Sequence, residues 1–441
     1  MPPETPSLPT LARRIAALAG PTMAIGILQA ASQLIETVLA ARQGTVALAG
    51  WALVLPFTLL LQQLSGGAMG GGVVSAIARS LGAGRRDDAA ALVLHAVFIA
   101  LGFALVFVVL LAGFPRAVLG AIGGAQTAEA AVAYAIWLFG AGAVPAWLAN
   151  TLASVLRGGG KHGLAARVTL FAVVLHPPLA WLLMEPLGQG LAGLGMAFAL
   201  SQWGAALAMA LVVLRGGAGF VPTMRIAPRR ALFGRILSVG AVACAMSTLA
   251  NLTTILVTAQ IAVHGAAAVA AYGIAARLEF LMVLLSFGVG SALTALVGRA
   301  VGQGDWATAR RTAWVGGGAA LVICTCFGVA VALFPQGFAT FFSQDPAVVA
   351  LATRALVYIG PALGGFGLGM CLYFASLGAA RMRWLVVAAI TRLVVAVGGG
   401  ALLAGPLGIG LDGQFLAVAL GITCLGALIA SSVRPGVWST R

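Results

Sequence analysis

The sequence predicts an all-α polytopic membrane protein with twelve transmembrane helices, arranged as two parallel six-helix repeats. Three observations lead to this prediction. The 441 residues are 61% hydrophobic and only 8% charged, whereas a soluble domain carries about 25% charged residues. Apolar runs of about 20 residues or more, long enough to cross a bilayer, follow one another along the whole chain. Finally, the second half repeats marker residues of the first half at a constant offset of about 220 positions.

Each half of the chain contains six predicted spans. They cover residues 14–41, 46–79, 88–113, 128–155, 163–184, 190–214, 234–261, 266–299, 308–333, 348–375, 383–404 and 410–433. The recurring markers are Gly82 and Gly302, Gly84 and Gly304, Pro115 and Pro335, Pro186 and Pro406, and Arg79 and Arg299. Because six is an even number, both halves have the same orientation, which predicts a pseudo-two-fold axis along the membrane normal. Asp87 and Asp305 follow the glycine-containing turns and are expected to cap the next helices.

Arginine and lysine gather in the loops on one side of the predicted spans, so both termini are expected in the cytoplasm of a multi-pass protein of the cell inner (plasma) membrane. The predicted organisation has five segments. They are a cytoplasmic N-terminus (1–13), an N-terminal six-helix lobe (14–215), a cytoplasmic linker (216–230), a C-terminal six-helix lobe (231–434) and a cytoplasmic tail (435–441). The net charge of +15 follows this bias. No basic stripe with interleaved aromatic residues is present, so no nucleic-acid partner is expected.

The first span carries polar residues along one helical face. Thr22, Gln29 and Glu36 recur every seven residues, and Gln33 falls between the last two. A charged residue at the centre of a membrane helix costs roughly 2.5–3.5 kcal/mol on insertion scales. The stripe is therefore expected to face a water-filled cavity, with Glu36 as a functional residue. Its counterpart in the second half is the apolar Leu256, so the fold itself does not require an acid there.

The motifs resemble those of the MATE (multidrug and toxic compound extrusion) transporters. The segment from Ala270 to Asp305, which contains Tyr272-Gly-Ile-Ala-Ala-Arg277-Leu-Glu279, resembles the eighth span of that family. Gln33-Leu-Ile-Glu36-Thr-Val is similar to its first span, where Pro21 matches a helix-bending proline. The resemblance implies two six-helix lobes around a central cleft, and an antiporter that exports organic cations in exchange for H⁺ or Na⁺. It also implies that Glu36 belongs to the coupling site and that Pro21 is a hinge.

The sequence departs from the family pattern at His176. Many family members carry an acid in the fifth span, where this chain reads Ala172-Val-Val-Leu-His176-Pro177. Imidazole titrates near neutral pH, so His176 is a candidate proton relay with Glu36. The alternative is a core histidine bonded to a carbonyl group that the following prolines leave free. Few oxygen ligands for sodium remain, so the sequence favours protons over Na⁺ as the coupling ion.

Three more embedded charges, Arg277, Glu279 and Arg392, lie in the second half. A structural ion pair between Glu279 and Arg392 is the favoured interpretation, and a substrate contact is the alternative. Further polar residues of the first half are candidates for the lining of the substrate cavity, each with helix–helix contact as the simpler alternative. These candidates are Gln29, Gln33, Trp147, Asn150, Ser201 and Gln202.

The sequence thus predicts a monomeric, proton-coupled exporter of small organic cations, with membrane lipid as its surroundings. The alternative is a flippase of the same superfamily for lipid-linked precursors or polysaccharides, and a lipid-linked precursor would need a cationic cleft for its pyrophosphate. Arg277, Arg354 and Arg392 are its only candidate cations. A channel would show rings of like residues. The four histidines and five cysteines show no metal-ligand spacing, so neither an enzyme nor a cofactor or metal site is expected.

Overall fold

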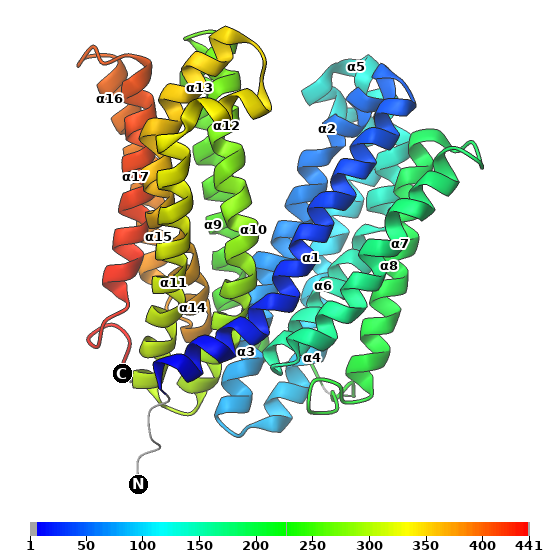
Figure 1. Cartoon of the computed structure of the whole chain (residues 1–441). Helices are drawn as coiled ribbons and strands as arrows, with labels where there is room; N and C mark the ends of the chain where they lie inside the picture. Colours follow the sequence, from blue (N-terminus) through cyan, green and yellow to red (C-terminus); the bar gives the residue numbers. More distant parts are fainter. Residues whose placement is uncertain (1–6, 226, 440–441) are drawn as a thin grey trace. The chain divides into compact units, whose positions relative to one another are not determined.

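The computed structural model describes residues 7–225 and 227–439, which are helical over most of their length (Figure 1). In lipid, every backbone polar group must be bonded within the chain, and helices achieve this locally. Eleven helices are long and apolar enough to span a membrane, and a pair bent by 44°, Thr127–Ala141 with Ala143–Gly158, makes a twelfth. The twelve predicted spans are therefore confirmed as helices of the described chain.

The elements of the first repeat follow the predicted order. They are α1 (Leu8–Arg42), α2 (Thr45–Gln62), η1 (Gln63–Met69), α3 (Gly70–Gly82), α4 (Arg86–Phe107), η2 (Val108–Gly113), α5 (Pro115–Ala135), η3 (Ile136–Ala141), α6 (Ala143–Gly158), α7 (His162–Met184) and α8 (Gly190–Leu214). Elements η1 and η3 are short π-helical stretches between α-helices, and η2 is one at the end of α4; such stretches often occur at functional sites.

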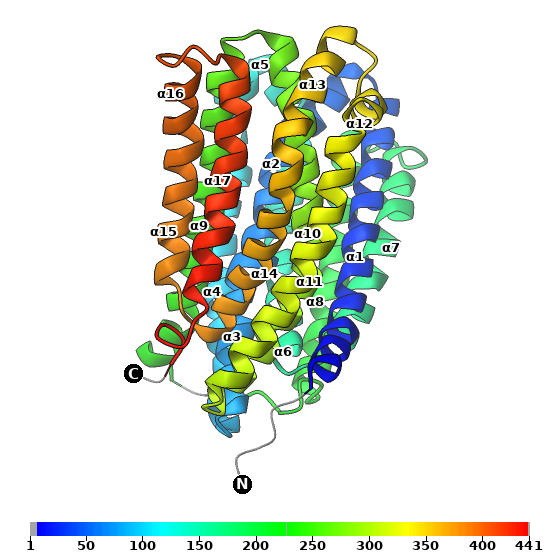
Figure 2. The ribbon, with the colours of Figure 1, turned by 60° about the vertical axis from the view of Figure 1, so that its left-hand side comes forward.

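The second repeat begins with α9, which follows the linker. Its elements are α9 (Arg230–Ala262), α10 (Ala266–Gly302), α11 (Trp306–Leu333), α12 (Pro335–Phe342), α13 (Pro346–Ile359), η4 (Gly360–Ala362), α14 (Leu363–Ala379), α15 (Arg383–Leu393), η5 (Val394–Gly399), α16 (Gly400–Ala404) and α17 (Leu411–Ser432). Helix α14 packs against α10, α11 and α17 (Figure 2). Large apolar side chains such as Phe171 and Phe341 are exposed, as expected for surfaces that contact lipid.

The duplication is visible in the backbone as well as in the sequence. Glycines with positive φ recur at the predicted offset: Gly84 (74°) with Gly304 (79°), Gly188 (66°) with Gly408 (67°), and Gly190 (53°) with Gly410 (65°). Glycine adopts this region without the steric penalty that a Cβ atom brings. Ala380, with φ 54°, repeats Gly160, with φ 79°. The two halves therefore share turn geometry even where the residue type has changed.

The two predicted capping acids behave differently. Asp305 caps α11, because its Oδ1 accepts the Thr308 N–H at 2.9 Å. The prediction for Asp87 is wrong, since α4 begins at Arg86 and has no side-chain cap. The neighbouring Asp88 instead pairs with Arg85 and Arg235, at 3.3 and 2.6 Å. At the start of α4, ion pairs of Asp88 with two arginines thus take the place of a side-chain cap.

The described chain divides into two compact units. The N-terminal unit comprises Leu18–Ala241, and the C-terminal unit comprises residues 7–17 and 242–439. The predicted linker, 216–230, lies in the N-terminal unit except for residue 226, which is outside the described residues. The Thr223 N–H donates to the Ala90 carbonyl at 3.2 Å, and the Arg229 N–H donates to His95 Nε2 at 2.8 Å. The predicted termini, 1–13 and 435–441, lie partly outside the described residues.

Helices of the C-terminal unit approach closely where glycines meet. A Cβ atom on Gly328 of α11 would fall on the carbonyl oxygen of Gly360, and one on Gly360 would come within 2.7 Å of the Gly328 carbonyl oxygen. We expect Gly328→Ala to destabilise the protein by about 1–3 kcal/mol, because backbone atoms cannot move aside as side chains do. Thermal unfolding in detergent measures this change. Gly318→Ala on the same helix is the control, because nothing lies within 4 Å of its added Cβ; equal melting temperatures for both variants would contradict the expectation.

Candidate functional site

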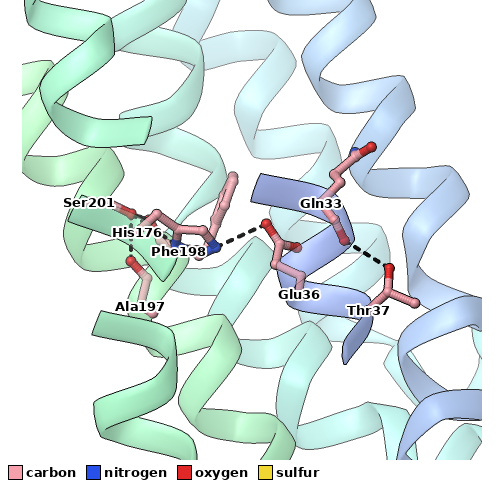
Figure 3. A network of polar contacts seen from close by, with 7 residues as sticks. All are labelled: Gln33, Glu36, Thr37, His176, Ala197, Phe198 and Ser201. Atoms are coloured by element: carbon pink, nitrogen blue, oxygen red, sulfur yellow. Dashed lines mark hydrogen bonds and ion pairs between the residues drawn. The ribbon is translucent and has the colours of Figure 1, made fainter. Parts of the chain in front are cut away.

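Glu36 and His176 lie in contact inside the N-terminal unit. Glu36 is on α1 and His176 is on α7, and Glu36 Oε1 is 3.1 Å from His176 Nε2 (Figure 3). The two side chains are only 16% and 9% exposed. The contact therefore joins two helices that are 140 residues apart in the sequence, at the two positions that sequence analysis proposed as partners.

Ser201 of α8 completes a three-residue chain of polar contacts. Its Oγ lies 3.3 Å from His176 Nδ1, so both ring nitrogens of His176 face a polar side chain. The ring also packs edge-on against Phe198, with 6.3 Å between the ring centroids. His176 therefore has side-chain partners on two other helices. This result disfavours the alternative of a core histidine that bonds only a free backbone carbonyl.

This arrangement can hold and transfer a proton. A carboxyl group and an imidazole within hydrogen-bond distance can share one proton. An ionised carboxylate at this depth also attracts a cation. The Glu36 carboxylate can therefore bind either a proton or a positively charged molecule. An antiporter that exchanges the two at a single carboxylate needs this property.

The other predicted residues of α1 do not join this cluster. The Gln33 side chain extends away from Glu36 in Figure 3, and its backbone carbonyl accepts the Thr37 hydroxyl at 2.8 Å. Gln29 is exposed, and Pro21 lies inside the continuous α1 helix. Among the predicted residues, the structure thus brings together Glu36, His176 and Ser201.

The predicted residues of α6 and α8 are placed in three different ways. Asn150 donates from Nδ2 to the Ser65 Oγ at 2.8 Å, which links α6 to the π-helical η1. Trp147 is fully buried and stacks on Phe103, with 5.3 Å between the ring centroids. Gln202 is half-buried. For all three residues, a place in the lining of the substrate cavity therefore stays a prediction.

Tyr134 is a further residue of this region that was not predicted from the sequence. This buried residue of α5 hydrogen-bonds the hydroxyl group of Thr58, and the negative charge of Glu36 acts on it electrostatically. The available signal was its rarity, since the chain contains only four tyrosines and this one interrupts an alanine-rich segment. Tyr134 therefore belongs to the electrostatic surroundings of Glu36.

The predicted ion pair of the C-terminal unit is present. Arg392 Nη2, at the end of α15, donates to Glu279 Oε1 of α10. The two side chains are 11% and 17% exposed, and the Arg392 guanidinium lies 5.9 Å from the centroid of the Phe366 ring. Arg277 is exposed. Arg354 pairs with Asp412 at 2.5 Å, so two of the three arginines considered for a flippase are paired with carboxylates.

Comparisons with known proteins agree with this architecture. The MatE family profile matches residues 21–182 and 241–402. A relative from Deinococcus radiodurans, "Probable multidrug resistance protein NorM", is 28% identical over 97% of this chain and 96% of its own length. A second "Probable multidrug resistance protein NorM", from Aromatoleum aromaticum, is also 28% identical, over 79% of this chain and 77% of its own.

Solved structures show the same fold. A MOP superfamily transporter from Pyrococcus furiosus, described as having a binding pocket of reverse polarity, matches with a TM-score of 0.89 at 22% identity. That match covers 97% of this chain and 96% of the other. A MATE crystal structure in the bent conformation also gives 0.89 at 22% identity and covers 98% of each chain. With the family profile matching both halves, and with the two helical repeats described above, the chain belongs to the MATE (MatE) family of membrane transporters.

Proposed function

We propose that this transporter is a multidrug antiporter that exports small organic cations in exchange for protons. The observation that carries the proposal is the buried contact between Glu36 and His176. The relatives named as multidrug resistance proteins support the export of several drugs. As a MATE transporter the chain is not an enzyme, and the proposed cycle uses no cofactor other than the coupling ion.

The proposed cycle depends on one carboxylate. When Glu36 is ionised, it favours a cationic substrate; when a proton from outside binds, the charge is removed and the substrate is released. Substrate and proton then compete for the same group, and each stabilises a different conformation of the transporter. In this proposal the protein is a monomer in the inner membrane with both termini in the cytoplasm, as the distribution of arginine and lysine favours.

The free energy of the Glu36–His176 hydrogen bond limits how far this contact can shift the equilibrium between the two conformations. A hydrogen bond to a charged group contributes about 1.5–3 kcal/mol, which changes a two-state equilibrium by a factor of about 10–150. A switch from 1:99 to 99:1 requires about 5.5 kcal/mol. The Glu36–His176 contact alone therefore biases the equilibrium without completing the switch, so binding of the cationic substrate must contribute the remainder.

Protons suit this site better than sodium. Sodium is a hard ion that prefers several oxygen ligands, by analogy with other hard cations. Here Glu36 is joined to an imidazole nitrogen, whereas a proton binds readily to either group. In the seventh predicted span, Asn251 replaces an acid, and its Nδ2 donates to the Ser247 carbonyl of its own helix at 2.9 Å. These contacts support proton coupling over sodium coupling.

A proteoliposome assay with separately imposed gradients tests the proposal. We expect a proton gradient to drive transport of an organic cation such as ethidium, and a sodium gradient at equal pH on both sides to drive none. The control is liposomes with no gradient, in which ethidium should not accumulate. Transport driven by sodium alone, or by neither gradient, would refute proton coupling.

A further inference from the structure

The hydroxyl hydrogen of Ser201 is already used within its own helix. The Ser201 side chain is buried, and its Oγ lies 2.6 Å from the Ala197 carbonyl oxygen and 3.1 Å from that of Phe198. A serine hydroxyl has one hydrogen to donate and two lone pairs that accept. Because the hydrogen points to these backbone carbonyls, only the lone pairs of Oγ remain for other neighbours.

His176 must therefore be the donor in its contact with Ser201. Its Nδ1 lies 3.3 Å from the Ser201 Oγ, and an acceptor at this position requires an N–H on Nδ1. The neutral ring then carries its hydrogen on Nδ1 and a lone pair on Nε2. Turning the ring by 180° would place carbon atoms against both Ser201 and Glu36, so this orientation is the one that gives both nitrogens a partner.

The Glu36 contact then requires one further proton. Glu36 Oε1 and His176 Nε2 are 3.1 Å apart. This bond forms if a protonated Glu36 donates to a neutral His176, or if a doubly protonated His176 donates to an ionised Glu36. The two cases differ only in the position of one proton. When that proton leaves, a carboxylate oxygen and a nitrogen lone pair face each other, and the bond is lost.

We propose that Ser201 is a positioning residue that fixes the Nδ1–H tautomer of His176 and makes the Glu36–His176 bond depend on one bound proton. The proposal rests on the proposed function, because that proton is the coupling ion. Without the serine, a neutral His176 can carry its hydrogen on Nε2 and donate to an ionised Glu36. The Glu36–His176 bond then persists after deprotonation. Loss of the proton would no longer break the contact between α1 and α7.

The polar groups of this cluster come from four helices besides α7. Glu36 approaches from α1 and Ser201 from α8. Tyr134 of α5 lies within the electrostatic influence of Glu36, and its hydroxyl group bonds Thr58 of α2. The tyrosine hydroxyl is ordinarily neutral at physiological pH, so Glu36 and His176 are the groups of this cluster that can carry a charge.

Nitrogen NMR of the full-length protein with ¹⁵N-labelled histidine tests the proposal, because the two neutral tautomers give different ring-nitrogen shifts. The spectra are recorded at a pH where His176 is neutral and Glu36 is ionised, and the His176 signals are assigned by their loss in His176→Gln. We expect the Nδ1–H tautomer in the wild type. In Ser201→Ala we expect the Nε2–H tautomer, and in Ser201→Thr, which keeps the hydroxyl, the wild-type tautomer.

Ser376→Ala is the matched control. Ser376 is also fully buried, and its hydroxyl bonds the Leu372 carbonyl of its own helix at 2.8 Å, but it belongs to the C-terminal unit. The His176 spectrum should not change in this variant. A neutral Nε2–H tautomer in the wild type, or no change in Ser201→Ala, overturns the proposal. If Ser201→Ala does not fold, the wild-type and Ser201→Thr spectra still decide the question.

The pH profile of ethidium efflux is the second readout. Efflux by Ser201→Ala should depend less steeply on pH than efflux by the wild type, and Ser201→Thr should restore the wild-type profile. If proton-driven efflux is normal but the His176 tautomer is the same in the wild type and in Ser201→Ala, this inference fails and the proposed function stands. If the tautomer behaves as expected but a proton gradient drives no efflux, the proposed function fails instead.

Discussion

Efflux driven by a pH gradient is expected to vanish in Glu36→Gln. Glutamine has nearly the shape of a protonated glutamic acid, and its amide can donate to His176 Nε2 as the protonated carboxyl group does. The variant should fold and insert normally, because a neutral side chain is easier to bury than a charged one. It cannot ionise, so it should lose the exchange of proton for substrate. The measurement is ethidium transport in proteoliposomes under an imposed pH gradient.

Three companion variants make this result specific. Glu36→Asp should keep part of the activity, because it keeps the titrating group. Glu129→Gln should transport normally, since Glu129 is 62% exposed and pairs with Arg116 rather than with the cluster. His176→Ala should shift the pH midpoint of transport if the histidine shares the proton; an unchanged pH dependence would show that His176 only packs.

Arg392→Ala is expected to lower stability strongly. Removing one partner of a buried ion pair typically costs about 3–5 kcal/mol, because the other charge is left without compensation. Arg392 and Glu279 are both largely buried, and Arg392 also packs near Phe366. We therefore expect a lower folded yield and a lower melting temperature in detergent. A single wild-type-like transition would be incompatible with a structural role for this pair.

The double variant Glu279→Gln with Arg392→Met should recover part of the loss, because it leaves no unpaired charge. Arg116→Ala is the control, since the Arg116–Glu129 pair is 69% and 62% exposed and exposed pairs contribute little. The structural assignment is wrong if Arg392→Ala is as stable as the wild type but does not transport. In that case Arg392 acts on the substrate instead.

The fold could be predicted from the sequence because its signals are local and repeated. Hydrophobic runs gave the spans, and glycines such as Gly84 and Gly304 marked turns that require positive φ. The failure at Asp87 has a physical cause. The sequence shows an acid after a glycine, but it does not show that Arg235, 147 residues away from Asp88, binds that neighbouring acid and shapes the turn.

The candidate site could be predicted only in part. Glu36 and His176 stood out because each is ionisable and each replaces an apolar residue of the other repeat. The role of Ser201 could not be predicted, because it depends on which way one hydroxyl points and on the rotation of α8 against α7. Tyr134 was missed for a similar reason, since Glu36 and Tyr134 belong to different helices and the sequence spacing between them does not show that the charge of one acts on the other.

The most direct test of the central claim measures proton movement itself. Proteoliposomes that contain a pH-sensitive dye are prepared at equal pH on both sides, and an ethidium gradient is then imposed. In the wild type we predict that ethidium flux drives protons in the opposite direction, and that Glu36→Gln shows no such proton movement. Proton movement and ethidium transport at the wild-type rate in Glu36→Gln would contradict the account.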